Sequence, residues 1–253
     1  MMPIVLLHAL AMTSAMWTGQ RRDLERLGHL VVSPDHQRMR GTAPSLAVLA
    51  DDLARDLDQR GIGEVALAGS SMGGYVAMAF LRRHPGRVRA LALLGTRAAA
   101  DDEPTAAGRH AFAESILDPL RRAIIVSSTV PKLVGATTRA ERPELVARVH
   151  AIVETVPSEA IAWSQRAIAA RPDSFEVLRA ADLPSVVIAG SEDELVPHAE
   201  ARRMADALPH ARLITVPAAG HLTPIEAPTA VTGALAELLE RAGTAAATGS
   251  SGC

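Results

Sequence analysis

A Gly-x-Ser-x-Gly pattern lies between a predicted strand and a predicted helix in residues 65–78, Val-Ala-Leu-Ala-Gly-Ser-Ser-Met-Gly-Gly-Tyr-Val-Ala-Met. The apolar run Val65–Ala68 predicts a buried strand, and residues 72–83, which stop just before a His-Pro pair, predict a helix. A serine at such a strand-to-helix turn has a strained backbone and an exposed hydroxyl. The context favours Ser71 as a nucleophile over an ordinary glycine-rich turn, and the absence of a following Lys disfavours a phosphate loop.

Similar apolar runs recur on both sides of this motif and alternate with amphipathic segments. They predict five further buried strands: Ile4–Leu7, Leu30–Ser33, Leu91–Leu94, Val186–Ala189 and Leu213–Val216. Helices are expected after an N-cap at Ser45, over residues 199–208 and from Pro228 onward. This alternation predicts an α/β fold with a mostly or wholly parallel sheet of about six strands and right-handed crossovers.

The alternation stops between about Arg97 and Ala180, where only helices are expected. They cover roughly Pro104–Leu117, Pro119–Thr129, Pro143–Thr155 and Ser158–Ala170. We therefore predict an α/β core formed by residues 1–96 and 181–241, with a helical cap, residues 97–180, inserted between the fourth and fifth strands. The alternative is a helical extension packed on the side of the core. Residues 242–253 are rich in Ala, Gly and Ser and are expected to be a disordered tail.

Composition excludes several classes of protein. Apolar residues make up 48% of the 253 residues, which rules out intrinsic disorder. The 26 basic and 28 acidic residues nearly balance, which argues against nucleic-acid or polybasic membrane binding. The lone cysteine, Cys253, excludes a disulfide scaffold and a metal site built on several cysteines within one chain. No apolar run approaches the about 18 residues of a membrane-spanning helix. We expect a cytoplasmic protein, monomeric or homodimeric.

A serine nucleophile needs a general base and an acid that orients the base. Asp193 follows the predicted strand Val186–Ala189, and His221 follows Leu213–Val216. The carboxyl ends of parallel strands are where open α/β sheets build their sites, so Ser71, Asp193 and His221 are expected to meet there as a catalytic triad. Separately, Asp193 would be read as a helix cap, with Glu192 or Glu194 as rivals, and His221 as a loop histidine.

Acyl transfer also needs two backbone N–H groups to stabilise an oxyanion. One is expected from Met72, which directly follows the nucleophile. The other is expected from the loop after the first strand, His8-Ala9-Leu10, where the Leu10 N–H is the candidate and His8 holds the loop by hydrogen bonds.

With these residues in place, the chain resembles the α/β-hydrolase superfamily, in particular its bacterial esterase and lactonase-like members, such as pimeloyl-ester carboxylesterases. Four segments from about Pro3 to Leu239 carry the resemblance: residues 5–9 with Trp17, residues 69–75, residues 190–193 with Val196-Pro197, and Gly220-His221 with Glu226 and Pro228. The resemblance is strong around the triad and weak in the helical insert.

The chain departs from the family pattern in three ways. Ala9 replaces the usual glycine of the oxyanion loop, and its Cβ is expected to alter the path of that loop, which carries the second N–H donor. Residues 35–45 only loosely match the family loop at that position, where His36, Gln37 and Arg38 stand instead of the usual residues. The family's two leading strands are not found before Ile4–Leu7, which leaves about six strands.

The resemblance implies a serine hydrolase that cleaves carboxylic esters or lactones of small to medium size through an acyl-enzyme, with no metal or cofactor. A serine rather than an aspartate at position 71 argues against dehalogenases and epoxide hydrolases of the superfamily. Alternatives within catalysis are a thioesterase, a C–C hydrolase or a perhydrolase. An alternative of another class is a ligand-binding or signalling module that retains the triad.

The substrate contacts are harder to assign from sequence. Trp17, Phe112 and Trp163 are candidate substrate-binding residues, although apolar side chains in such inserts are more often core. Several arginines of the insert are assigned to solvated faces, with the alternative that one of them binds a substrate carboxylate: Arg109, Arg121, Arg122, Arg139 and Arg166.

Overall fold

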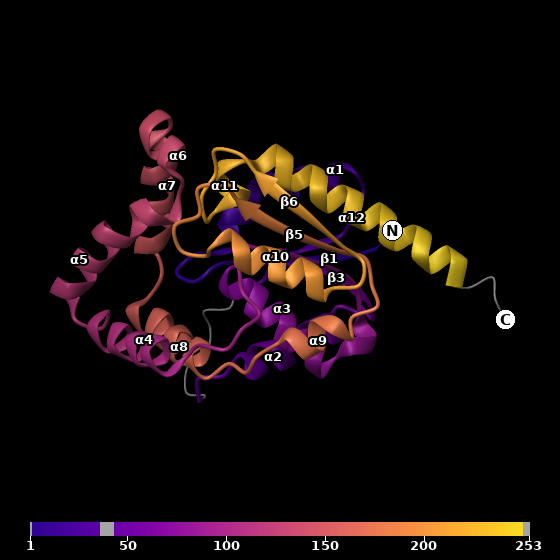
Figure 1. Cartoon of the computed structure of the whole chain (residues 1–253), viewed down its shortest axis with the longest axis horizontal. Helices are drawn as coiled ribbons and strands as arrows, with labels where there is room; N and C mark the ends of the chain where they lie inside the picture. Colours follow the sequence, from indigo (N-terminus) through magenta and orange to yellow (C-terminus); the bar gives the residue numbers. More distant parts are fainter. Residues whose placement is uncertain (1, 36–42, 250–253) are drawn as a thin grey trace.

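The computed structural model describes residues 2–35 and 43–249, and the predicted parallel sheet is its centre (Figure 1). All pairings between its six strands are parallel, and the strand order is β2-β1-β3-β4-β5-β6. The strands are β1 (Ile4–Leu7), β2 (Val31–Val32), β3 (Val65–Ser70), β4 (Val88–Leu94), β5 (Ser185–Gly190) and β6 (Ala211–Val216). The predicted fold class is therefore confirmed.

Alternate side chains of each strand enter separate cores on the two faces of the sheet, as the period of two requires. Val5 and Leu7 of β1 pack on one face, together with α2 (Leu46–Gln59), α3 (Met72–Arg83), α9 (Phe175–Arg179) and α10 (His198–Ala207). Ile4 and Leu6 pack on the other face, together with α1 (Thr18–Arg26), α11 (Thr223–Glu226) and α12 (Pro228–Gly249). Both faces are covered, which explains why the strands are apolar nearly throughout.

Local signals account for several element boundaries. The Ser45 hydroxyl accepts a hydrogen bond from the Ala47 N–H at 3.2 Å and caps α2. The chain leaves α2 through Gly61 at a φ of 68°, a conformation that favours glycine. β4 begins at Val88, earlier than predicted, because the exposed Arg89 interrupts the apolar run that marks the strand.

Between β4 and β5 the chain forms helices only. Four match the predicted segments: α4 (Glu103–Ser115), α5 (Pro119–Thr129), α7 (Pro143–Glu154) and α8 (Ser158–Ala169). Two short helices, α6 (Ala136–Glu141) and α9, and the 3-10 turn η4 (Val130–Leu133) were not predicted. Helices α4 to α8 gather beyond one end of the sheet (Figure 1). Their assignment to a separate cap domain remains a prediction.

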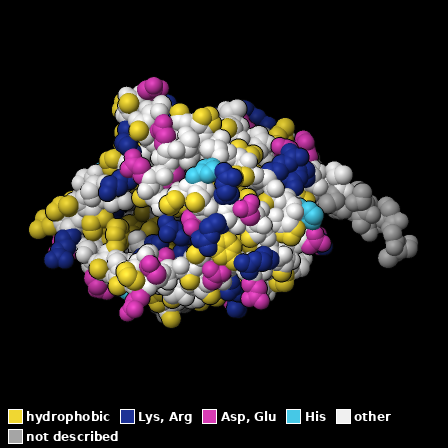
Figure 2. All heavy atoms as spheres, in the orientation of Figure 1, with side chains coloured by type: hydrophobic (Ala, Val, Ile, Leu, Met, Phe, Trp, Pro, Cys, Tyr) yellow, Lys and Arg dark blue, Asp and Glu magenta, His cyan; other side chains and the backbone are white. Residues whose placement is uncertain are grey.

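The insert has a small apolar core of its own and also an exposed apolar face. Ala113, Ile116 and Ile161 are buried together, whereas Leu120 and Ile124 of α5 are 80% and 68% exposed. Figure 2 shows apolar side chains gathered at the α5 end of the molecule, opposite the C-terminus.

The C-terminal segment differs from the prediction of disorder over 242–253. Helix α12 continues to Gly249, and Ala242 is buried in the core against the sheet. Alanine is the best helix former, and this anchor lets the Ala-rich segment extend the helix. Residues 250–253 lie outside the described residues, as do positions 36–42 of the loop that loosely matches the family pattern. Within the described residues, no helix combines the length and apolarity needed to cross a membrane.

Candidate active site

Ser71 occupies a sharp turn between the end of β3 and the start of α3. Its φ of 52° and ψ of −114° lie in a region that non-glycine residues rarely adopt. The flanking glycines permit this geometry, since a Cβ at Gly69 would lie 2.3 Å from the Gly73 carbonyl oxygen. A Cβ at Gly73 would lie 2.1 Å from the Leu7 carbonyl oxygen of β1. Both glycines of the sequence motif are therefore required by close packing of backbone on backbone.

The neighbouring strand holds this turn in place. The Ser71 N–H donates to the Leu94 carbonyl at 2.8 Å, and the Thr96 hydroxyl donates to the Ser71 carbonyl at 2.8 Å. Gly74, in the first turn of α3, lies against Thr96, where an added Cβ would come within 2.6 Å of the threonine methyl group. The end of β4 thus fixes the backbone of Ser71 from outside its own motif.

Asp193 and His221 meet as predicted at the carboxyl ends of β5 and β6. Asp193 Oδ2 lies 2.9 Å from His221 Nδ1, and the two side chains are only 4% and 5% exposed. Asp193 Oδ1 accepts hydrogen bonds from the Leu195 and Val196 N–H groups at 2.8 and 3.0 Å. With both carboxylate oxygens engaged, the aspartate holds the imidazole in one orientation with Nε2 left for other chemistry.

These contacts decide the charge of Asp193. Burial alone would raise the pKa of this carboxyl group. The hydrogen bond and charge of His221, together with the two backbone N–H groups, outweigh burial and hold the pKa of Asp193 below its ordinary value. The carboxylate is therefore ionised at neutral pH.

Gly95 packs directly against this aspartate–histidine pair. It has a φ of 50°, and an added Cβ would lie 3.0 Å from the His221 carbonyl oxygen and 3.5 Å from Asp193 Oδ2. Any side chain here would press against the aspartate–histidine pair.

Glu226, which the sequence places after the histidine loop, is a buried link between that loop and the insert. Its carboxylate accepts hydrogen bonds from the Gly220 N–H at 3.0 Å and from the Gly135 N–H at 2.7 Å. The side chain is almost fully buried. The Leu222 N–H also donates to the Leu133 carbonyl at 3.0 Å. The segment between α5 and α7 is therefore bonded directly to the loop that carries His221.

The same segment is bonded to the acid loop. Glu192 accepts hydrogen bonds from the Thr137 N–H and hydroxyl at 2.8 and 2.6 Å, and Arg139 pairs with Glu194 at 2.6 Å. The two acidic neighbours of Asp193 thus have partners in the insert, while Asp193 itself pairs with His221.

The loop after β1 reaches the same region. Ala9, Leu10 and Ala11 line one cavity with Ser71, and the N–H groups of Leu10 and Met72 have no hydrogen-bond acceptor within residues 2–35 and 43–249. The positive φ of this loop falls at Ala11, at 57°, so the Cβ of Ala9 imposes no unfavourable backbone conformation. His8 Nδ1 lies 2.9 Å from the Ala9 carbonyl oxygen, and burial lowers the pKa of His8.

Ser71 and His221 face one cavity of about 300 Å³ between the sheet and the insert. Its walls are mostly apolar, with Phe112, Ile116, Leu133 and Ile168 among the lining side chains. Phe112 thus lies where a substrate contact was predicted. No hydrogen bond joins the Ser71 hydroxyl to His221 in the part of the chain that the structure describes, and such contacts often tighten only when substrate is bound.

The other two predicted substrate contacts do not line this cavity. Trp17 is fully buried in the core on the face of the sheet that α1, α11 and α12 cover. Trp163, on α8, packs against the core on the opposite face of the sheet. Neither tryptophan is therefore among the residues that line the cavity of Ser71.

Two arginines, Arg97 and Arg109, line the cavity, and its lining residues include no aspartate or glutamate. Arg109 was expected on a solvated face, but its side chain is only 20% exposed and pairs with Asp101. Asp101 also pairs with the buried Arg171 at 2.8 Å. Arg97 was not predicted as a site residue. The one sequence signal that points to it is its position just after strand β4.

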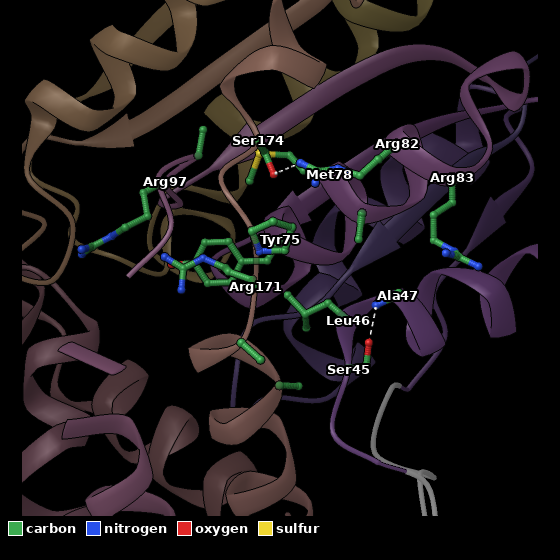
Figure 3. Close-up of a pocket in the computed structure, with 15 residues that line it drawn as sticks. Ser45, Leu46, Ala47, Tyr75, Met78, Arg82, Arg83, Arg97, Arg171 and Ser174 are labelled. Atoms are coloured by element: carbon green, nitrogen blue, oxygen red, sulfur yellow. Dashed lines mark hydrogen bonds between the residues drawn. The ribbon is translucent and has the colours of Figure 1, made fainter. Parts of the chain in front are cut away.

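A second cavity, of about 130 Å³, lies beyond Tyr75 and contains neither Ser71 nor His221. Figure 3 shows Arg171 stacked on Tyr75 at its centre, with the Arg171 guanidinium carbon 4.3 Å from the ring centroid. Arg97 contributes to both cavities, and in Figure 3 its guanidinium is directed away from Arg82 and Arg83. Among the described residues, no three His, Cys, Asp or Glu side chains are grouped to hold a metal ion.

Comparison with known proteins agrees with this fold. A thermophilic esterase from Thermogutta terrifontis, solved with malate bound, superimposes with a TM-score of 0.90 at 31% identity, over 96% of this chain and 90% of the esterase. A Variovorax paradoxus protein named as a candidate carbamate hydrolase is 29% identical over 86% of this chain and 84% of its own length. A 2-hydroxymuconate semialdehyde hydrolase from a Pseudomonas species is 27% identical over 88% of this chain and 82% of its own length. Residues 2–228 match the family model for the alpha/beta hydrolase fold, and the chain therefore belongs to the α/β-hydrolase family.

Proposed function

We propose that this protein is a serine hydrolase that cleaves carboxylic esters or lactones of small to medium size. One observation carries the proposal: Ser71, in its strained turn, faces the same cavity as the hydrogen-bonded pair of His221 and Asp193. The three residues take the roles of nucleophile, general base and orienting acid. The similarity to the Thermogutta esterase supports ester cleavage in particular.

The proposed reaction begins when His221 Nε2 takes the proton of the Ser71 hydroxyl as its oxygen attacks the substrate carbonyl. Ionised Asp193 stabilises the imidazolium through Nδ1. The Leu10 and Met72 N–H groups bind the oxyanion, and the positive end of α3 favours the same charge. His221 then protonates the leaving alcohol, and water activated by His221 hydrolyses the acyl-enzyme.

The test is hydrolysis of p-nitrophenyl esters from acetate to decanoate by the wild type and by Ser71→Ala. We expect repeated turnover by the wild type and a fall in kcat of about 10⁴-fold or more in Ser71→Ala. Ser70→Ala is the matched control, because the Ser70 hydroxyl is buried without a hydrogen-bond partner in the described residues and its variant should stay active. Equal rates for wild type and Ser71→Ala would refute the proposal.

C–C bond hydrolysis is a second candidate, favoured by the similarity to 2-hydroxymuconate semialdehyde hydrolase over most of both chains. The two are separated by the same panel extended to a C–C cleavage substrate. If that substrate turns over at least tenfold faster than every ester, the second candidate replaces the first.

A further inference from the structure

We propose that Arg97 binds a carboxylate group of the substrate, so that the enzyme prefers esters carrying an anionic group remote from the reacting carbonyl. The identity of the reacting bond rests on the proposed function, whereas the binding of a carboxylate at Arg97 does not. The proposal follows from the hydrogen bonds, the charge and the position of this one side chain.

Arg97 has too few partners for a partly buried guanidinium. Of its five N–H donors, the only hydrogen bond in the described residues runs from Nη2 to the Leu195 carbonyl at 3.0 Å. Its Nε is buried and has no hydrogen-bond partner in residues 2–35 and 43–249. No carboxylate lies within ion-pair distance of this guanidinium among the described residues, in contrast to Arg109 and Arg171. A planar carboxylate could satisfy the free donors in the paired geometry that guanidinium groups favour.

The charge of the cavity favours an anion. Its lining residues include two arginines and no acidic side chain. The Arg109 charge is shared with Asp101, which also neutralises Arg171, so a single carboxylate serves two guanidinium groups. Arg97 adds a further positive charge that no acidic side chain of the described residues pairs with, in a space of low polarity where the attraction for an anion is strong.

The position of Arg97 ties this anion to the reacting centre. Three successive residues follow β4: Gly95 lies beneath the aspartate–histidine pair, Thr96 holds the Ser71 carbonyl, and Arg97 lines the cavity. A carboxylate bound to Arg97 would therefore lie in the same cavity as the acyl group attacked by Ser71. The remaining walls are mostly apolar, and they suit an aliphatic body between the two polar ends.

The competing interpretation is that Arg97 only supports the acid loop. The Leu195 carbonyl that it contacts belongs to the residue whose N–H donates to Asp193 Oδ1 at 2.8 Å. A purely supporting role predicts an equal loss of activity toward all substrates when Arg97 is replaced. A binding role predicts a loss confined to anionic substrates.

The experiment compares two matched pairs of substrates, so that the anion is tested on either side of the ester bond. Mono-p-nitrophenyl glutarate is paired with its neutral methyl ester, and 4-acetoxybenzoate is paired with methyl 4-acetoxybenzoate. The wild type, Arg97→Gln, Arg97→Lys and Arg121→Gln are compared. Arg121 is the control because it is exposed on α5 and does not line the cavity.

In at least one pair, we expect Arg97→Gln to lower kcat/KM for the anionic member by about 30-fold or more through KM, and to change the neutral member less than threefold. Arg97→Lys, which keeps the charge, should recover part of the preference, and Arg121→Gln should match the wild type. Equal losses on anionic and neutral members, or no loss on either, would overturn the binding role.

Equilibrium binding separates this inference from the proposed function. Glutarate, adipate and benzoate are titrated into Ser71→Ala and into Ser71→Ala carrying Arg97→Gln, with glutaramide as the neutral control. Tighter binding of at least one carboxylate that is lost with Arg97 supports the site even if no ester is hydrolysed. Affinities that are the same in both variants would exclude it, even in an active esterase.

Discussion

Ser71 and Gly95 both have positive φ angles, of 52° and 50°, but for different reasons. At Ser71 the strained backbone exposes the hydroxyl, and packing of the flanking glycines together with bonds from β4 maintains it. At Gly95 the positive φ lets the backbone pass directly beneath His221. The sequence motif predicts the first from its spacing, whereas nothing local marks the second.

Gly95→Ala should therefore reduce activity more than stability. The added Cβ would lie 3.0 Å from the His221 carbonyl oxygen, and the positive φ costs about 1 kcal/mol or more for alanine. We expect kcat on a p-nitrophenyl ester to fall at least tenfold, with a Tm lowered by a few degrees. Gly233→Ala is the matched control, since an added Cβ there meets nothing within 4 Å and helix propensity favours alanine. A fully active Gly95→Ala enzyme would show that the His221 loop tolerates displacement.

At the scale of elements, the strands and long helices follow from their apolar patterns, while the short helices depend on distant partners. Helix α6 begins where Thr137 bonds to Glu192, and no signal within residues 136–141 announces that contact. The positions of Ser71, Asp193 and His221 could be predicted because each follows a strand of a parallel sheet. The burial of Trp17 and the location of Arg97 could not, because they depend on how the insert and the β1 loop pack.

Glu226 is the contact through which the insert and the histidine loop support each other. In Glu226→Gln the amide would present N–H groups to the Gly135 or Gly220 N–H, donor against donor. We expect the free energy of unfolding in denaturant to fall by about 1–3 kcal/mol, and kcat to fall as the His221 loop loosens. An unchanged kcat together with the expected loss of stability would show that the catalytic loop is held by other contacts.

At the scale of the whole molecule, two buried carboxylates make stability depend on pH. Burial raises the pKa of Asp101, but its bonds to Arg171 and Arg109 outweigh burial and hold that pKa below its ordinary value, as the contacts of Asp193 do for its own. Because the unfolded chain takes up these protons at higher pH than the folded one, the stabilisation is complete above the ordinary carboxyl range and is lost as the pH falls through the folded values.

We therefore expect the contribution of these two carboxylates to the free energy of unfolding to be nearly constant from pH 7 to about 5 and to decrease below about pH 4. The lowered pKa of buried His8 adds a separate, earlier decrease that begins as the pH falls below the ordinary histidine value of 6.5. Asp101→Asn should lower stability at pH 7, since it leaves Arg109 and Arg171 without their shared carboxylate, and should make the decrease in acid shallower. Urea unfolding curves measured at intervals between pH 7 and 3 would test both effects. Parallel curves for wild type and variant would mean that Asp101 does not contribute to the acid dependence.

The sheet is built from two parts of the chain that lie on either side of the insert, and this affects how the protein could be cut and reassembled. The aspartate–histidine pair belongs wholly to the chain from β5 onward, and the strained serine belongs wholly to the chain before α4; the pairing of Leu91–Leu94 with Ser185–Ile188 joins them in the sheet. Neither half holds a complete site. A cut within the insert would divide the protein into one fragment that carries Ser71 and another that carries Asp193 and His221. The rate of turnover would then measure how far the two fragments have reassembled.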